Sequence, residues 1–384
     1  MAVVEDVTNK DRHLTERALT WASTMAGYPA EASGESSGIR TAHEGAAALE
    51  PDFGILDRVA REELERLTLA RGATRGLGAG RRAREEEPDD WRTCFERDRD
   101  RILHSPAFRR LAGKTQVFVF PADHQRTRLT HALEVAQVAA AIARACRLNV
   151  ALVEAIALGH DCGHGPGGHA SEDALSPFVD GGFDHAVWGA DVTTAGLNLC
   201  EETLDGIRNH SWSRPAPATP EGEVASLADR IAYTAHDLED AAHAGIVDLG
   251  ALPELVRERC GSTRSSQLRA FIGDVVETTH GSGVVAMSAG MAEALAELRR
   301  FDYEKIYLRE SSLEQSRRVI EMLSALVEHF AGHPAEMPQE FAGADAPSSW
   351  RAVAYVAGMT DRYACSQAIA RLNWSRDRLP RGAD

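Results

Sequence analysis

Apolar residues recur at helical spacing along most of the chain from about residue 90 onward. The segment THALEVAQVAAAIARACRL at 130–148 predicts a long amphipathic helix, in which Leu133, Val138 and Ile142 lie on or near the apolar face. Alternation of the kind that strands show is scarce. Further helices are expected at 151–160, 195–210, 223–244, 264–277, 290–309, 311–331 and 347–372. The pattern therefore predicts an all-α fold.

Charge and composition narrow the classes of function. The chain carries a formal net charge of −16, which argues against stable nucleic-acid binding and against an anionic membrane surface. The six cysteines form no CxxC pair, which fits a reducing compartment better than a disulfide scaffold. No segment approaches the roughly 18–20 apolar residues of a membrane span, and the start MAVVEDVTNKDRH is not typical of a signal peptide. We therefore expect a soluble, cytoplasmic protein.

Two histidines and two aspartates are candidate metal ligands: His131, the adjacent pair His160–Asp161, and Asp229. Each lies in or at the end of a predicted helix, so each can be held rigidly. Adjacent helical residues point about 100° apart, so His160 and Asp161 reach one ion most easily where the helix ends, and the glycines of DCGHGPGGH provide that break. A lone histidine is usually a core residue, but a buried Asp161 would be costly without a cation. The set suits one divalent ion: Mn²⁺, Fe²⁺, Zn²⁺, Co²⁺ or, less comfortably, Mg²⁺.

Five blocks follow one another in order along the chain. They are RDRDRILHSPAFRRLAGKTQVF, RTRLTHALEVAQVA, EAIALGHDCGHGPGGHASEDAL, LADRIAYTAHDLEDA and YVAGMTDRYA. These blocks resemble the successive signatures of the HD-domain superfamily, in its dGTP triphosphohydrolase-like branch, over about residues 90–370. The resemblance implies an HD-domain helical bundle with additional C-terminal helices, and it implies that His131, His160, Asp161 and Asp229 bind the metal.

Three regions are expected along the chain. Residues 1–89 form an N-terminal extension that is partly flexible, and AEASGESSG at 30–38 is typical of a flexible segment. Residues 90–245 form the metal-binding HD core. Residues 246–384 form a C-terminal helical region that packs on this core and completes the site.

The resemblance also implies a set of catalytic residues. The glycine-rich loop supplies His164 and His169, and the sequence FDH supplies His185. His169 and Glu172 are three residues apart at a predicted helix start, so they can share a face. A carboxylate beside an imidazole raises its pKa and fixes its orientation, which suits a proton donor. By resemblance, His169 protonates the departing nucleoside oxygen with Glu172 as its partner, and His185 contacts the phosphates or stabilises charge.

Substrate contacts are expected on a second set of residues. Asp229, Tyr233 and Asp237 are spaced four residues apart and share one helix face; the resemblance places Tyr233 and Asp237 against the sugar. Such a stripe is by itself more often core packing. By resemblance, Arg128 binds phosphate and Gln116 lies near the deoxyribose. Lys305 and Arg309 are further candidate phosphate contacts, with a solvated helix face as an equal alternative.

The resemblance implies a metal-dependent phosphohydrolase that is expected to work as a homo-oligomer. We expect it to cleave deoxynucleoside triphosphates to deoxynucleoside and triphosphate, through attack of metal-activated water on the α-phosphorus. One alternative is an HD-type nucleoside 5′-monophosphatase, which would release orthophosphate. A second alternative is a non-catalytic nucleotide sensor or nucleic-acid-binding HD module.

Overall fold

The computed structural model describes residues 15–30, 38–47, 49, 54–121, 123–342 and 346–381. The chain forms two compact units, 1–55 and 56–384, which are described separately. In the first unit, helix α2 (Glu16–Ser23) precedes two short antiparallel strands, β1 (Tyr28–Pro29) and β2 (Arg40–Thr41). Most of the segment expected to be flexible, 31–37 of 30–38, lies outside the described residues.

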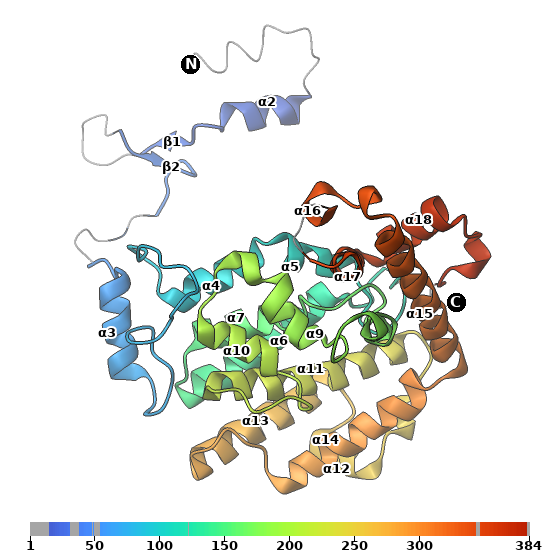
Figure 1. The fold of residues 1–384 in the computed structure, drawn as a ribbon. Coiled ribbons are helices and arrows are strands. Elements are labelled where there is room, and N and C mark those ends of the chain that lie inside the picture. The colour runs from blue at the N-terminus through green and yellow to red at the C-terminus, as the bar shows by residue number, and fades with distance from the viewer. Residues whose placement is uncertain are drawn as a thin grey trace, which may run out of the picture. The chain divides into compact units, whose positions relative to one another are not determined.

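The second unit is helical (Figure 1). Its helices are α3 (Arg58–Thr68), α4 (Cys94–Leu103), α5 (Pro106–Arg110), α6 (Arg128–Cys146), α7 (Val150–Gly159), α8 (Ala170–Leu175), α9 (His185–Trp188), α10 (Glu201–Asn209), α11 (Pro220–His243), α12 (Glu254–Cys260), α13 (Arg264–Ser282), α14 (Ala289–Asp302), α15 (Glu310–Gly332), α16 (Gln339–Ala342), α17 (Ser348–Ala357) and α18 (Asp361–Leu372). Across the described residues, β1 and β2 form the only sheet, so the predicted all-α class is confirmed. No described helix is both long and apolar enough to span a membrane.

Side-chain caps fix where several of these helices begin. The Asn149 side chain accepts a hydrogen bond from the Leu152 N–H at the start of α7. Thr219 caps α11, whose first residue is a proline, and Thr360 caps α18. Such caps satisfy backbone N–H groups that have no partner inside the helix. They set the ends of the helices that carry the site.

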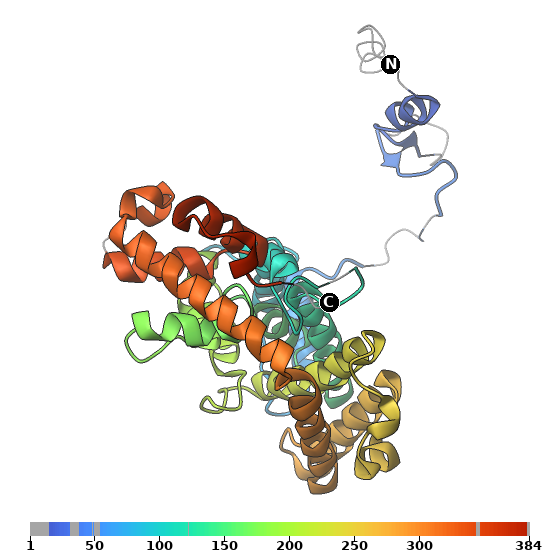
Figure 2. The same ribbon diagram turned by 90° about the vertical axis from the view of Figure 1, so that its right-hand side faces the viewer.

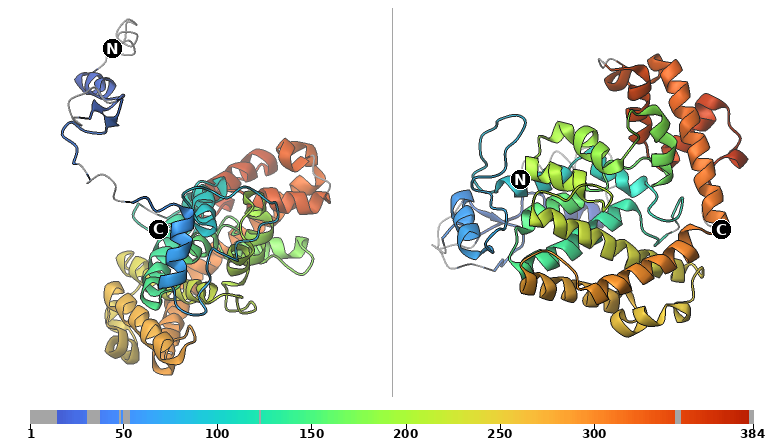
Figure 3. Two further views of the ribbon diagram at one scale, coloured as in Figure 1. Left: turned by 90° about the vertical axis from the view of Figure 1, so that its left-hand side faces the viewer. Right: turned by 60° about the horizontal axis from the view of Figure 1, so that its bottom comes forward.

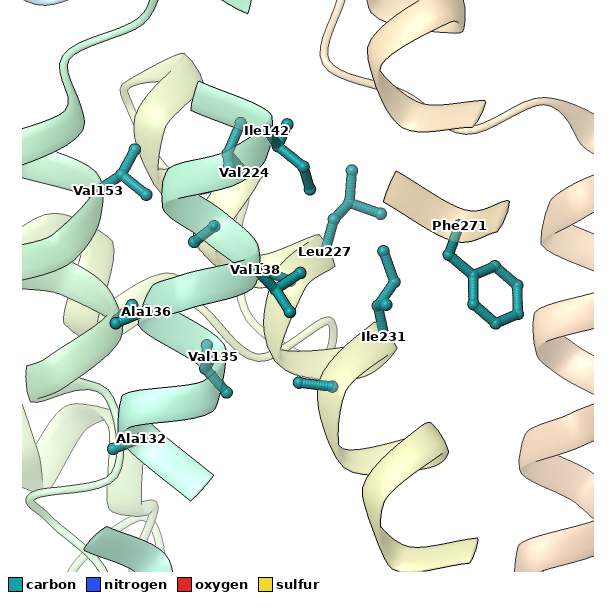
Figure 4. Packing of buried hydrophobic residues seen from close by; sticks show 14 of the residues in the cluster. Ala132, Val135, Ala136, Val138, Ile142, Val153, Val224, Leu227, Ile231 and Phe271 are labelled. Atoms are coloured by element: carbon teal, nitrogen blue, oxygen red, sulfur yellow. The ribbon is translucent and has the colours of Figure 1, made fainter. Parts of the chain in front are cut away.

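A first hydrophobic core forms where α6 packs against α7, α11 and α13. Figure 4 shows Val138 and Ile142 of α6 directed toward Leu227 and Ile231 of α11. Helices α12, α13 and α14 gather beside α11 (Figure 3). The expectation for Leu133 is wrong, because this side chain is 45% exposed. Five residues separate it from Val138, which turns it about 140° around the helix.

A second core lies along α15, the long helix that packs against α8, α17 and α18 (Figure 2). The single helix predicted at 347–372 is two helices, because the chain breaks at Gly358–Thr360 and Thr360 caps a new helix. The helix predicted at 195–210 begins only at Glu201, since Asn198 adopts a left-handed conformation with φ of 53°. The expected division at residues 89 and 245 stays a prediction.

Candidate active site

The four candidate metal ligands meet at one point inside the second unit. His131 lies on α6, His160 and Asp161 directly follow α7, and Asp229 lies on α11. The His131 Nε2 atom is 3.1 Å from Asp229 Oδ1 and 3.9 Å from Asp161 Oδ2. The His160 Nε2 atom is 3.6 Å from Asp229 Oδ1 and 3.5 Å from Asp161 Oδ1. Three helices therefore bring two imidazoles and two carboxylates together.

The end of α7 sets the geometry of His160 and Asp161, as the glycine-rich sequence predicts. The helix ends at Gly159, so the two ligands leave it in sequence and can face one point. A Cβ atom at Gly163 would collide with the backbone carbonyl of His185 and with the backbone of Gly189. Only glycine therefore lets the chain turn this closely against α9.

The orientation of His160 favours a cation at this point. Its Nδ1 is 2.6 Å from the Ala157 carbonyl, which can only accept, so Nδ1 carries the proton. In the neutral ring, which is the form that binds a metal, the lone pair of Nε2 faces two carboxylates, and Nε2 has no hydrogen-bond partner among the described residues. Electron pairs of this kind repel one another unless a cation lies between them. The residues present therefore fit a divalent metal ion.

A second cluster of titratable residues lies beside this set. Glu172 Oε1 is 3.2 Å from His169 Nδ1 and 2.8 Å from His185 Nδ1. The rings of His185 and His164 stack with centroids 3.7 Å apart, and His164 Nε2 is 3.3 Å from Asp161 Oδ1. Burial opposes ionisation of Glu172, but hydrogen bonds with His169 and His185 hold its pKa well below the usual value. Glu172 therefore stays a carboxylate that orients two imidazoles.

Both clusters open into a cavity of about 1000 Å³. Its apolar lining comes from both hydrophobic cores, with Phe118 and Ile306 from the first and Ala170 and Val319 from the second. Among the described residues, six arginines line it: Arg128, Arg230, Arg299, Arg309, Arg318 and Arg381. An acidic chain thus concentrates positive charge at one place, which suits an anionic ligand.

Arg128 reaches both the cavity and the ligand set. Its Nη1 donates to Asp161 Oδ2 at 2.7 Å, and the residue is buried. Arg128 Nε has no hydrogen-bond partner among the described residues. The guanidinium therefore fixes the carboxylate of Asp161 and keeps donor capacity for an anion in the cavity.

The residues expected near a sugar also line this cavity. Tyr233 and Asp237 lie on α11, and the Tyr233 oxygen accepts a hydrogen bond from Arg299 Nε at 2.7 Å. Asp237 accepts a hydrogen bond from the Tyr307 hydroxyl. Gln116 lines the same cavity, and its buried Oε1 has no partner within the described chain. These side chains therefore offer hydrogen-bond donors and acceptors to a polar ligand.

Comparison with known proteins places the chain in a family. Residues 128–234 match the model of the HD domain, and residues 285–369 match that of a phosphohydrolase-associated domain. A deoxyguanosinetriphosphate triphosphohydrolase-like protein from Caldanaerobacter subterraneus is 44% identical over 312 residues, which cover 79% of this chain and 92% of the relative. The chain belongs to the deoxyguanosinetriphosphate triphosphohydrolase-like family.

As a member of this family of HD phosphohydrolases, the protein is a hydrolase. A relative from Clostridium perfringens with the same family name is 40% identical over 324 residues, covering 80% of this chain and 94% of the relative. A solved phosphohydrolase from Bacteroides thetaiotaomicron is more distant, with 19% identity and a TM-score of 0.44, covering 66% of this chain and 65% of that chain. All four candidate metal ligands fall inside the HD match.

Several cavity residues of this triphosphohydrolase-like protein escaped the sequence analysis. They are His210, Arg230, Arg299, Tyr303 and Tyr307. Arg299, Tyr303 and Tyr307 could have been found from their four-residue spacing, which places them on one side of a helix. Lys305, a candidate phosphate contact, is instead exposed and does not line the cavity. A π-helical turn at Tyr303–Tyr307 interrupts the regular helix there and changes which residues face inward.

Asp302 provides the first testable prediction, which concerns the stability of the protein and not its activity. Both its carboxylate oxygens are buried without a hydrogen-bond partner in the described chain. Burial, together with the charge of Asp237, raises the pKa of Asp302 from 3.8 to about 9. The unfolded chain releases this proton at lower pH than the folded chain, so stability falls as pH rises toward 9. We expect Asp302→Asn to stabilise the protein by an amount that grows by about 1.4 kcal/mol per pH unit, or about 5 kcal/mol between pH 5 and pH 9.

Thermal unfolding at a series of pH values measures this effect. Asp274→Asn is the control, because Asp274 accepts hydrogen bonds from the backbone and hydroxyl of Ser288 and should gain nothing at high pH. A pH-independent change in Tm for Asp302→Asn would contradict the assignment.

Proposed function

We propose that the protein cleaves deoxynucleoside triphosphates to a deoxynucleoside and inorganic triphosphate. One observation supports this function most strongly. The candidate cation site and the His169–Glu172–His185 cluster open into a single cavity, which six arginines line within the described part of the chain. A cavity of about 1000 Å³ is at the upper end of the range for small-molecule sites and has room for a nucleotide.

His131, His160, Asp161 and Asp229 would hold one divalent cation. When bound, such an ion lowers the pKa of water and neutralises phosphoryl charge. Arg128, which donates to Asp161, orients this ligand and faces the phosphates. Arg230 and Arg299 extend the positive wall of the cavity. Guanidinium groups suit phosphate because they present two parallel N–H donors.

Proton transfer falls to His169 in this proposal. The Nδ1 atom of His169 contacts the Glu172 carboxylate. The same carboxylate also contacts His185, which fixes its position. The His169 side chain lines the cavity and is 79% exposed, so it can exchange its proton with solvent between turnovers. His169 would protonate the 5′-oxygen of the nucleoside as it departs. His164 and His185 stack behind it and would stabilise charge on the phosphoryl oxygens.

The sugar would lie against α11. Tyr233 and Asp237 line the cavity one turn apart, with the Tyr233 ring as a surface for the deoxyribose and Asp237 as an acceptor for a hydroxyl group. Tyr307 and Arg299 hold these two side chains in place. A ring packed under the sugar leaves little room for a 2′-hydroxyl, which is why we propose deoxynucleotides. Gln116 would contact the same sugar.

Product analysis tests this function directly. The four deoxynucleoside triphosphates and their monophosphates are incubated with Mn²⁺, Mg²⁺ or Co²⁺, and all products are separated by ion-exchange chromatography. We expect triphosphate and deoxynucleoside in equal amounts, and no orthophosphate. Orthophosphate from the monophosphates would instead support a 5′-monophosphatase, and binding without turnover a nucleotide sensor. Light scattering on the same sample tests the proposed homo-oligomer.

A further inference from the structure

Asp361, the first residue of α18, joins two loops that carry site residues. Its Oδ2 accepts hydrogen bonds from the backbone N–H of Thr115 at 2.9 Å and from the Thr115 hydroxyl at 2.6 Å. Its Oδ1 accepts a hydrogen bond from the backbone N–H of Gly167 at 2.9 Å. Asp361 is only 4% exposed. A single buried carboxylate therefore connects segment 114–118 with the glycine-rich loop 162–169.

Both joined segments bear directly on the cavity. Thr115 immediately precedes Gln116 and forms a β-bridge with Thr127, the residue before Arg128. Gly167 lies two residues before His169, in the loop that begins after Asp161. A shift of either segment would move a side chain that faces the ligand. The three hydrogen bonds of Asp361 thus act on the positions of residues that Asp361 does not itself touch.

Lys114 adds a second connection between the same elements. Its buried ammonium group donates to the carbonyl of Ala357, at the end of α17, at 3.0 Å and to the carbonyl of His164. The fit is close, since a Cβ atom on Gly113 would lie 2.9 Å from the Thr360 side chain. Burial lowers the pKa of Lys114 to about 7, and the nearby carboxylate of Asp361 opposes this shift.

We propose that Asp361 is a positioning residue, through which the phosphohydrolase-associated region holds His169 and Gln116 in their working positions. This assignment rests on the proposed function. It gives a role to the C-terminal sequence block YVAGMTDRYA, which contains Asp361 and contributes no side chain to the cavity lining. The C-terminal helices then act on the reaction by holding segment 114–118 and the glycine-rich loop 162–169 in place.

Asp361→Asn is the informative change, because it keeps the shape but replaces one acceptor oxygen with an amide donor. If the amide oxygen stays on Thr115, the NH₂ group faces the N–H of Gly167, and that bond is lost. We expect kcat to fall by about 10²-fold, the cost of a misplacement of roughly 1 Å. Bound metal, measured by elemental analysis, should remain at the wild-type level, because no metal ligand is changed.

Asp98→Asn provides the matched control. Asp98 is also a buried aspartate that accepts hydrogen bonds from a backbone N–H, of Cys200, and from a threonine hydroxyl, of Thr203, and it additionally pairs with the buried guanidinium of Arg82. It joins α4 to α10 and does not line the cavity. Because it also breaks the buried ion pair with Arg82, we expect Asp98→Asn to lower Tm at least as much as Asp361→Asn while kcat stays near the wild-type value. If the two variants lose activity in proportion to their loss of Tm, Asp361 has a structural role only.

Hydrogen–deuterium exchange gives a readout that needs no turnover. In Asp361→Asn, exchange should rise in peptides that cover 113–119 and 163–170, whereas in Asp98→Asn it should rise near 198–204. Unchanged exchange at 113–119 and 163–170 would overturn the inference. If the wild-type protein hydrolyses no nucleotide, the proposed function fails, while the exchange comparison still decides whether Asp361 holds the two loops.

Discussion

Replacing Asp161 with alanine abolishes turnover, which we expect as a loss of more than about 10³-fold in kcat/KM, beyond the usual cost of one electrostatic contact. Asp161 lies within 4 Å of His131, His160 and His164, and it accepts a hydrogen bond from Arg128. Its removal takes away a metal ligand and leaves the buried guanidinium without this partner. Kinetics, elemental analysis of bound metal and the rise of Tm on adding Mn²⁺ measure the effect.

A surface aspartate supplies the control for this experiment. Asp191 pairs with Arg208 at an exposed position and does not line the cavity. Asp191→Ala should keep its metal, its response to Mn²⁺ and its activity. Near-normal turnover in Asp161→Ala, or a full complement of bound metal, would refute the proposed cation site.

Replacing His169 with alanine has the second largest expected effect, a fall in kcat of about 10²–10⁴-fold, as is typical for loss of a proton donor. The reason is chemical, since a nucleoside 5′-oxygen leaves slowly as an unprotonated alkoxide. A nitrophenolate leaves readily without a proton. With bis(p-nitrophenyl) phosphate as substrate, His169→Ala should therefore lose far less activity than with a deoxynucleoside triphosphate.

The control is a second histidine–carboxylate pair far from the cavity lining. His329 Nε2 lies 3.1 Å from Glu336, close to the spacing of His169 and Glu172, and His329 does not line the cavity. His329→Ala should leave both activities near the wild-type values. Equal losses on the two substrates in His169→Ala would mean that His169 positions the phosphate and does not donate the proton.

The placement of His160 and Asp161 could be predicted because its signals are local, whereas the approach of His131 to Asp229, 98 residues away, was expected from the resemblance of the ordered sequence blocks. His160 and Asp161 follow an apolar helix and precede a run of glycines, and this pattern alone indicates a helix end with two polar residues directed inward. His169 and Glu172 likewise meet through their three-residue spacing. Short-range geometry of this kind is encoded in neighbouring residues, so it can be predicted without knowledge of the tertiary fold.

Other parts of the site depend on contacts that are distant in the sequence. The four-residue spacing of Arg299, Tyr303 and Tyr307 places them on one side of a helix, but no local signal shows that this side faces the cavity. Of the two phosphate contacts expected in this stretch, Arg309 lines the cavity and Lys305 does not. The hydrogen bonds of Asp361 to Thr115 and Gly167 span 246 and 194 residues. No local periodicity in the sequence indicates a hydrogen-bond partner at such a distance along the chain. The break between α17 and α18 differs, because its signals are local: Gly358 ends one helix and the Thr360 side chain caps the next.

The interior surface that would enclose a nucleotide is divided between two separately packed cores. Phe118 belongs to one of them and Val319 to the other, so neither core alone provides a complete container. A substitution that repacks either core changes the width of the cavity, even where the metal ligands and the proton-transfer residues are unchanged. Stretches 128–234 and 285–369 each contribute residues to both cores, so they are under a common constraint, and over evolutionary time their apolar residues should change in concert.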